Sequence, residues 1–182
     1  MIKKIKSHNQ GFTLIEILIV IGLIAILAVV ALLAINPAQA QKRTRDIQRM
    51  KDLSTIEGVL SQWIADGNGP TTGKCLDPIV GGTCNSSAST GTSESCSSNF
   101  LQEDLCKYAN SIPVDPLNGN TVAFVNGAGS TTSTVAQYIV GLSGVDYEVN
   151  ARLESPQNDD RVASDGGNDL TTLEQGTSLT IL

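Results

Sequence analysis

Gly11-Phe12-Thr13-Leu14-Ile15-Glu16, with the apolar run behind it, is the stretch that decides how this chain is organised. The 24 residues from Phe12 to Ile35 contain a single charged side chain, that of Glu16. A helix of this length measures about 36 Å at 1.5 Å per residue, enough to cross a bilayer core of roughly 30 Å. An ionisable residue inside such a segment is costly, so its presence indicates a functional role.

A short leader with three lysines, residues 1–11, precedes the apolar run. Its lysines favour a cytoplasmic N-terminus, although the basic residues behind the run weaken this bias. An ordinary secretory signal is the competing interpretation, because Ala38-Gln39-Ala40 matches a cleavage site and cleavage there would leave Gln41 first. The apolar region of a signal peptide usually spans about 7–15 residues, well short of this run. A membrane-spanning segment over residues 12–35 is therefore the favoured interpretation.

The leader, Gly11, Phe12, Glu16 and the long apolar helix together resemble the class III signal of type IV pilins and type II secretion pseudopilins. The resemblance is specific over residues 1–40 and covers the rest of the chain only in general layout. In that family a membrane-embedded aspartyl prepilin peptidase cuts after the glycine and methylates the new N-terminus. The resemblance therefore implies cleavage between Gly11 and Phe12, with an N-methylated Phe12 as the first residue of the mature protein.

Glu16 gains an assembly role from the same resemblance. Cleavage before Phe12 would create a cationic amine in the first turn of the helix. In a filament, Glu16 of one subunit would neutralise the amine of its neighbour inside a low-dielectric core, where an unpaired charge costs several kcal/mol. The alternative is an acid that only complements the positive end of the helix macrodipole.

Residues 36–66 are predicted to form an amphipathic continuation of the helix, because apolar residues recur there at spacings of three and four. Asn36-Pro37 either kinks the long helix or ends its first half. Trp63 is expected to anchor the core of the head. The predicted apolar face holds Ile47, Met50, Leu53, Ile56, Val59, Leu60, Trp63 and Ile64, and the predicted polar face holds Arg45, Arg49, Asp52 and Gln62.

Residues 67–182 are predicted to form an extracytoplasmic head with a half-buried antiparallel sheet that covers the apolar face of the helix. The strand candidates are residues 121–126, 134–142 and 146–154, with a further strand at 177–182 and a short helix at 101–109. The connector at 111–119 is similar to the Pro-x-Asp-Pro segment of many pseudopilin-type heads. The predicted fold is α+β and pilin-like: a long N-terminal helix, membrane-spanning in its first half, packed against a small antiparallel sheet.

Four cysteines, Cys75, Cys84, Cys96 and Cys106, lie in or beside a loop-like region rich in Gly, Ser and Thr. Their spacing contains no C-x-x-C pair, which argues against a zinc site, whereas a location outside the cytoplasm favours disulfides. Four cysteines allow three pairings, and the spacing does not choose among them. We expect the two local loops, Cys75–Cys84 and Cys96–Cys106.

Charge is divided along the chain. From Asp66 onward there are 14 acidic residues against four basic ones, which argues against nucleic-acid binding by the head, because phosphate contacts need Lys and Arg. The basic cluster at 42–51 either contacts anionic lipid headgroups, pairs with acids on a partner, or is a solvated helix face. The acidic tail with Asp159, Asp160, Asp165 and Asp169 has oxygen ligands suited to calcium, but its spacing does not match an EF-hand loop, and we expect a plain acidic loop.

No catalytic constellation stands out in the sequence, since the single histidine, His8, lies in the leader. We therefore expect a protein that is not an enzyme and needs no cofactor. The resemblance implies a homo-oligomeric, pilus-like filament, made by a prepilin peptidase and an inner-membrane assembly platform. Its subunit would first lie in the bilayer of the cytoplasmic membrane and then be displayed outside the cell. The alternatives are a pseudopilin of a type II secretion or DNA-uptake system, and a single-span anchored surface domain that binds a ligand and never polymerises.

Overall fold

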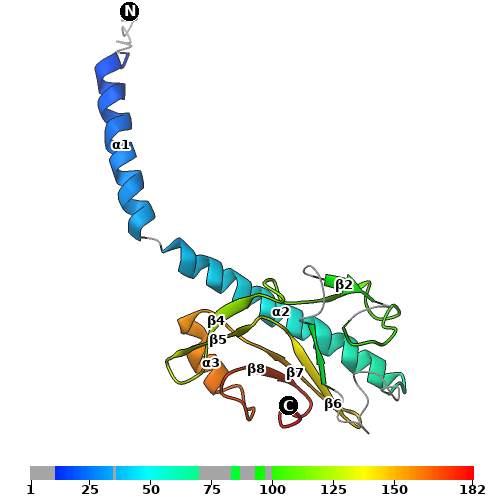
Figure 1. Ribbon diagram of the computed structural model, residues 1–182. Coiled ribbons are helices and arrows are strands. Elements are labelled where there is room, and N and C mark those ends of the chain that lie inside the picture. The colour runs from blue at the N-terminus through cyan, green and yellow to red at the C-terminus, as the bar shows by residue number, and fades with distance from the viewer. Residues whose placement is uncertain (1–10, 35, 70–82, 87–92, 97–99) are drawn as a thin grey trace, which may run out of the picture. The chain divides into compact units, whose positions relative to one another are not determined.

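The computed structural model describes residues 11–34, 36–69, 83–86, 93–96 and 100–182 (Figure 1). The chain divides into two compact units, Met1–Ala40 and Gln41–Leu182. The fold is α+β, with an apolar N-terminal helix and antiparallel β-sheets, as predicted from the sequence and consistent with pilin-like architecture.

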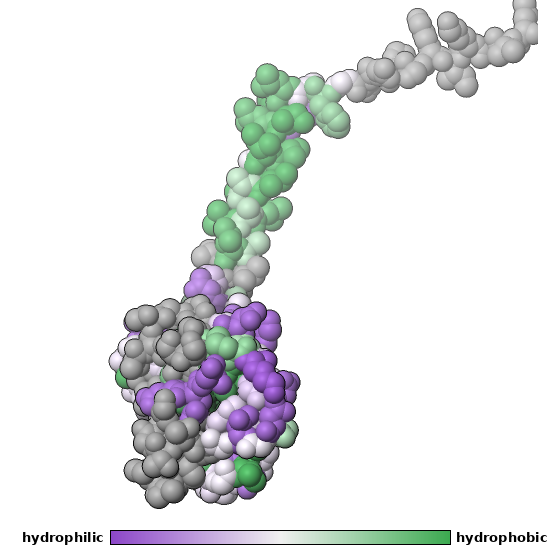
Figure 2. Space-filling model, turned by 90° about the vertical axis from the view of Figure 1, so that its right-hand side faces the viewer, coloured by the Kyte–Doolittle hydropathy of each residue, from purple (hydrophilic) through white to green (hydrophobic). Residues whose placement is uncertain are grey.

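Helix α1 (Leu14–Ala34) is formed by the apolar run. The segment Leu14–Leu32 is long and apolar enough to cross a membrane, and none of it is buried within the structure. Figure 2 shows hydrophobic residues, in green, along this helix. A helix that is apolar on every side needs apolar surroundings, which a lipid bilayer or a bundle of other helices supplies.

A second helix, α2 (Pro37–Ala65), begins directly after Asn36. Pro37 occupies the first helical position, where its missing N–H costs nothing and its fixed φ suits the helix. The Asn36 side-chain Oδ1 accepts a hydrogen bond from the backbone N–H of Gln39 at 3.3 Å, which caps the new helix. Asn36-Pro37 was predicted either to kink the long helix or to end its first half. The structure has two helices, with α1 ending at Ala34 and α2 separately capped. Ile35, between them, lies outside the described residues.

A four-stranded antiparallel sheet in the order β1-β6-β7-β8 forms the centre of the second unit. Its middle hairpin pairs Val140 with Val149 and Leu142 with Tyr147. The two-residue loop between these strands begins with Gly144, whose φ of 65° suits a tight hairpin turn. The strands are β1 (Thr83–Asn85), β6 (Ile139–Ser143), β7 (Asp146–Ala151) and β8 (Leu173–Gly176).

The described part of this unit also contains two smaller sheets and the short helical segments η2 and α3. Strands β2 (Ser93–Ser95) and β3 (Ser111–Pro113) form one antiparallel pair, and β4 (Thr121–Val125) and β5 (Thr131–Val135) form the other. The segment after β7 contains the 3-10 helix η2 (Pro156–Asn158) and helix α3 (Asp159–Ala163).

The core of the unit lies between α2 and the sheet. Trp63 is 4% exposed and belongs to this core, as predicted. The loop around Cys106 contributes Phe100, Leu101 and Leu105, which are also buried. The core residues of α2 are Leu53, Ile56, Val59, Leu60 and Trp63, and those of β6 and β7 are Val140, Leu142, Tyr147, Val149 and Ala151.

The predicted division of α2 into an apolar and a polar face was wrong at three positions. Ile47, assigned to the apolar face, is 63% exposed. Arg49 and Asp52, assigned to the polar face, are buried. Arg49 is ion-paired and Asp52 accepts a hydrogen bond from the Tyr138 hydroxyl at 2.8 Å, so their polar groups are satisfied inside the head.

Several predictions for the sheet were also wrong. Residues 134–142, expected as one strand, are divided between β5 and β6. The last strand is β8, and residues 177–182 after it are not a strand. Outside the sheet, residues 101–109 form turns instead of the expected helix. A half-buried sheet leaves one face in solvent, but the polar residues Glu148 and Asn150 of β7 are buried. The tail covers Glu148, whose carboxylate accepts hydrogen bonds from the backbone N–H groups of Ile181 and Leu182, and Asn150 donates a hydrogen bond to the same carboxylate.

Candidate functional site

The first turn of α1 is closed by a reciprocal pair of hydrogen bonds between Thr13 and Glu16. The Glu16 carboxylate accepts bonds from the backbone N–H and the side-chain hydroxyl of Thr13, both at 2.8 Å. The Thr13 Oγ1 accepts a bond from the backbone N–H of Glu16 at 3.3 Å. Thr13 and Glu16 therefore form a capping box, in which each side chain satisfies a backbone donor that the helix leaves free.

The residues around this box are exposed. Gly11 and Phe12 precede the helix in irregular backbone, and Phe12 is 84% exposed. The lysines of the leader lie outside the described residues. The peptide bond between Gly11 and Phe12 thus stands in accessible backbone immediately before a long apolar helix, an arrangement that a protease can approach.

A comparison with protein families identifies this segment. Residues 6–32 match the prokaryotic N-terminal methylation motif. The match includes the end of the leader, the capping box and almost all of α1. It supports a precursor like those of type IV pilins and pseudopilins, as the sequence predicts. Searches of curated proteins and of solved structures found no match.

Within the methylation motif, the structure adds Thr13 to the residues singled out from the sequence. The spacing Thr-x-x-Glu ahead of an apolar run is a recognised helix-start signature, and it was present in the sequence. The capping box also gives Glu16 a local structural role in the isolated subunit. Cleavage at Gly11-Phe12 and the assembly role of Glu16 stay predictions.

The cysteines lie far along the chain from the methylation motif. Cys96 and Cys106 form a disulfide with a Cα–Cα distance of 4.8 Å, one of the two local loops expected. Cys84 is buried, but Cys75 lies outside the described residues, so the pair Cys75–Cys84 stays a prediction. The Cys96–Cys106 loop encloses Phe100, Leu101 and Leu105 and thereby holds three core side chains in place.

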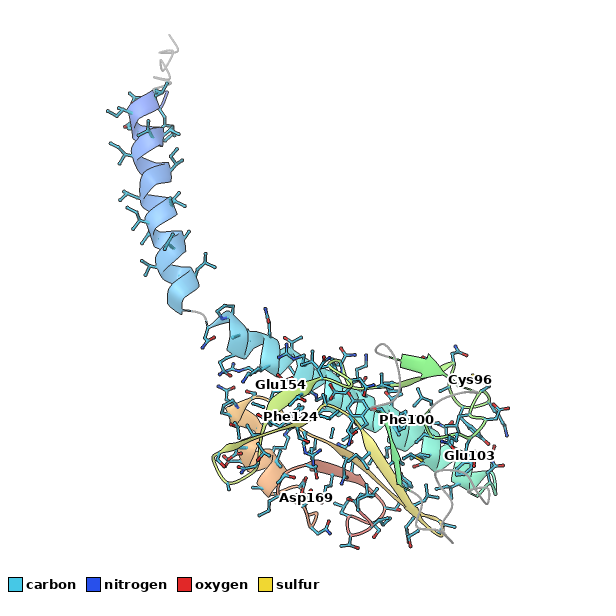
Figure 3. All side chains as sticks on the ribbon, viewed as in Figure 1. Cys96, Phe100, Glu103, Phe124, Glu154 and Asp169 are labelled. Atoms are coloured by element: carbon cyan, nitrogen blue, oxygen red, sulfur yellow. A yellow bond between two sulfur atoms is a disulfide. The ribbon has the colours of Figure 1, made fainter. Side chains whose placement is uncertain are left out.

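A buried ionic cluster joins α2 to the rest of the head. Arg49, which is fully buried, donates to both oxygens of Asp115 at 2.7 and 3.1 Å, to Glu154 at 2.7 Å and to Asp46 at 3.0 Å. Arg45 forms a second two-pronged contact with Glu154 at 2.8 and 2.6 Å. Figure 3 shows Glu154 and Phe124 beside α2, and the Arg49 guanidinium lies 5.2 Å from the Phe124 ring centroid.

Backbone donors complete the cluster. The Asp46 carboxylate accepts hydrogen bonds from the backbone N–H groups of Glu154 and Ser155, each at 2.8 Å. Burial opposes the charge of Glu154, but the hydrogen bonds from Arg45 and Arg49 outweigh it and lower the pKa of that carboxyl. Burial likewise opposes the charge of Arg49, and its carboxylate partners raise its pKa. The shifts of Arg49 and Glu154 both favour their charged forms, so the cluster acts as an ionic clamp between α2 and the segment around Glu154.

Two acids of the C-terminal segment accept hydrogen bonds from backbone N–H groups of the head. Asp159 accepts bonds from the backbone N–H groups of Gly127 and Gly129, at 2.8 and 2.6 Å. Asp165 accepts one from Gly167 at 3.0 Å and one from Glu174 at 2.9 Å. Among the described residues, no group of three or more Asp, Glu, His and Cys side chains is arranged to hold a metal ion. The question of calcium binding stays open to direct titration.

Glu174 is a buried acid in this segment whose carboxylate is only partly hydrogen-bonded. It is 2% exposed, and its Oε2 has no hydrogen-bond partner, while its Oε1 accepts the backbone N–H of Asp169 at 3.1 Å. Burial, together with the nearby carboxylates of Glu148 and Asp165, raises the pKa of Glu174 to about 7. In the folded head this side chain therefore holds its proton at a pH where an unfolded glutamate has lost it.

We expect the head to lose stability as the pH rises from about 4.5 to about 7, the interval between the unfolded and folded pKa of Glu174. The folded state binds the additional proton, so its removal costs folding free energy. Glu174→Gln, which mimics the protonated form, should abolish this part of the pH dependence and raise the free energy of unfolding at pH 8 by up to about 3 kcal/mol. Urea unfolding of both proteins at pH 5 and pH 8 measures the effect. If the free energies of unfolding of the two proteins differ by the same amount at pH 5 and at pH 8, Glu174 does not cause the pH dependence.

Proposed function

We propose that the chain is the precursor of a subunit of a type IV pilus-like filament. The observation that carries the proposal is the match of residues 6–32 to the methylation motif, which includes the end of the leader and most of α1. It is supported by an apolar helix that no part of the described structure covers. Such a helix is suited first to a bilayer and then to a bundle of identical helices in a filament core.

In this proposal each part of the N-terminal unit has one task. The leader presents the bond between Gly11 and Phe12 to a prepilin peptidase, which cuts it and methylates the Phe12 amine. Helix α1 holds the processed subunit in the cytoplasmic membrane until an assembly platform moves it into the filament. Glu16 then pairs with the Phe12 amine of a neighbouring copy. The head remains outside the cytoplasm, where its disulfide is stable.

A pseudopilin of a type II secretion or DNA-uptake system would have the same precursor, helix and processing, and it is the second candidate. Both candidates predict the same mature N-terminus. A single-span anchored domain that never polymerises would instead keep Met1, and a secreted protein would begin at Gln41.

Mass spectrometry of the mature protein, isolated from cells with its native processing enzymes, tests the proposal. We expect a chain that begins at N-methylated Phe12. Gly11→Leu places a branched side chain at the position where the peptidase must approach the backbone closely, and it should leave the full-length chain in the membrane. A mature N-terminus at Met1 or Gln41 in the natural sequence would reject the filament-subunit proposal.

A further inference from the structure

The structure places four of the five basic residues of segment 42–51 in two groups, while the fifth, Lys42, is half-buried. Arg45 and Arg49 are ion-paired with Glu154 and Asp115 inside the head. Arg43 and Lys51 take part in none of the ion pairs between described residues, and both are exposed. Arg45 and Arg49 therefore belong to the fold, whereas Arg43 and Lys51 face away from it.

An exposed isoleucine lies between the two outward-facing cations. Arg43, Ile47 and Lys51 follow one another at intervals of four residues, which places them in one row along α2. We call these three residues the outer row. Ile47 is 63% exposed, although Leu53, Ile56 and Leu60 on the same helix are fully buried. Two cations that flank an exposed apolar side chain form a surface suited to the boundary between lipid headgroups and acyl chains.

The outer row starts near the end of the apolar span. Arg43 follows the first residue of α2 by six positions, about 9 Å along the helix axis. The Cα–Cβ bonds of a helix tilt toward its N-terminus, so the long side chains of the row extend toward the end of α2 that is joined to α1. Basic side chains this close to a membrane-spanning helix are attracted to anionic lipid headgroups.

We propose that the outer row binds the anionic headgroups of the membrane that α1 crosses, with Ile47 buried at the level of the headgroups. This inference rests on the proposed function only in requiring that α1 spans a membrane. From residue 66 onward the chain is predominantly acidic, so the outer row is the part of the head that an anionic surface attracts. The contact would hold the start of α2 on the membrane until the subunit leaves the lipid.

Photocrosslinking from position 47 tests this proposal. The full-length chain, with p-benzoylphenylalanine in place of Ile47, is reconstituted into nanodiscs of phosphatidylcholine alone or mixed with phosphatidylglycerol. We expect lipid adducts by mass spectrometry that increase with the phosphatidylglycerol fraction. Each cation near an anionic surface raises the ratio of membrane-bound to unbound outer rows about fivefold. At low occupancy, the double variant Arg43→Gln with Lys51→Gln should therefore lower the adduct yield by about 25-fold. The same photoprobe in place of Gln62, which is exposed farther along α2, is the matched control.

Each other outcome overturns the proposal. An adduct between two copies would assign the outer row to a subunit contact, and the absence of any adduct from position 47 would assign it to solvent. If the yield of lipid adducts does not change with the phosphatidylglycerol fraction, the outer row makes no electrostatic contact with anionic headgroups. This result needs no variant. Failure of the chain to insert into nanodiscs would contradict the proposed function as well, whereas insertion without a lipid adduct would contradict only this inference.

Discussion

Glu16→Ala is expected to give a processed, membrane-inserted subunit that enters filaments poorly, at less than about a tenth of the normal yield. The reason is that cleavage before Phe12 leaves a cationic amine, and a buried amine without an acidic partner costs several kcal/mol in the filament core. Membrane insertion depends on the apolar residues of α1, which the substitution leaves unchanged. Sheared filament yield, normalised to processed subunit in the membrane fraction, is the measurement.

The capping box offers a control that separates the charge of Glu16 from its local structural role. Thr13→Ala removes a hydrogen-bond partner of Glu16 but keeps its charge, whereas Glu16→Gln keeps a capping side chain and removes the charge. If the carboxylate neutralises a neighbouring amine, Glu16→Gln should fail to assemble and Thr13→Ala should assemble. Similarly low filament yields from the two variants would mean that assembly requires the helix start and not the ion pair. A normal yield from Glu16→Gln would contradict the ion pair directly.

The parts of the fold that could be predicted from the sequence are those governed by local pattern. The uninterrupted apolar run predicts α1 from length and polarity alone. Apolar spacings of three and four predict α2 within residues 36–66, and Asn36-Pro37 indicates its start. The turn at Gly144 and the start of β7 also follow from neighbouring residues. In each case the deciding interactions lie within a few positions of one another.

The parts that could not be predicted depend on residues far apart in the chain. Arg49 is separated by 66 positions from Asp115 and by 105 from Glu154, so no local window shows that its charge is paired. Glu148 is buried because the C-terminal residues Ile181 and Leu182 cover it and donate their backbone N–H groups to its carboxylate. The hydropathy pattern of β7 alone would place this glutamate in solvent. Thr13 is a different case, because the Thr-x-x-Glu capping signature lies within four residues and is visible in the sequence.

Arg49→Ala is expected to destabilise the head by about 3–5 kcal/mol, the largest effect of any single substitution considered for this unit. Removal of the guanidinium would leave the carboxylates of Asp46, Asp115 and Glu154 together in a buried site, with Arg45 as the remaining cation. The fluorescence of Trp63, the single tryptophan and a core residue, reports unfolding of the head directly. Urea unfolding of the full-length chain in detergent micelles gives the difference in free energy.

Two further substitutions decide what the measured loss means. Arg43→Ala removes an exposed arginine from the same helix, so it controls for helix propensity and net charge and should stay within about 0.5 kcal/mol of the natural protein. Arg49→Lys keeps a positive charge but cannot reproduce the two-pronged contact with Asp115, and its stability should lie between the other two. If Arg49→Ala unfolds at the same urea concentration as Arg43→Ala, the cluster contributes no net stability. The attachment of α2 to the sheet would then rest on the apolar core alone, since the desolvation cost of five buried or half-buried charges would have cancelled their mutual attraction.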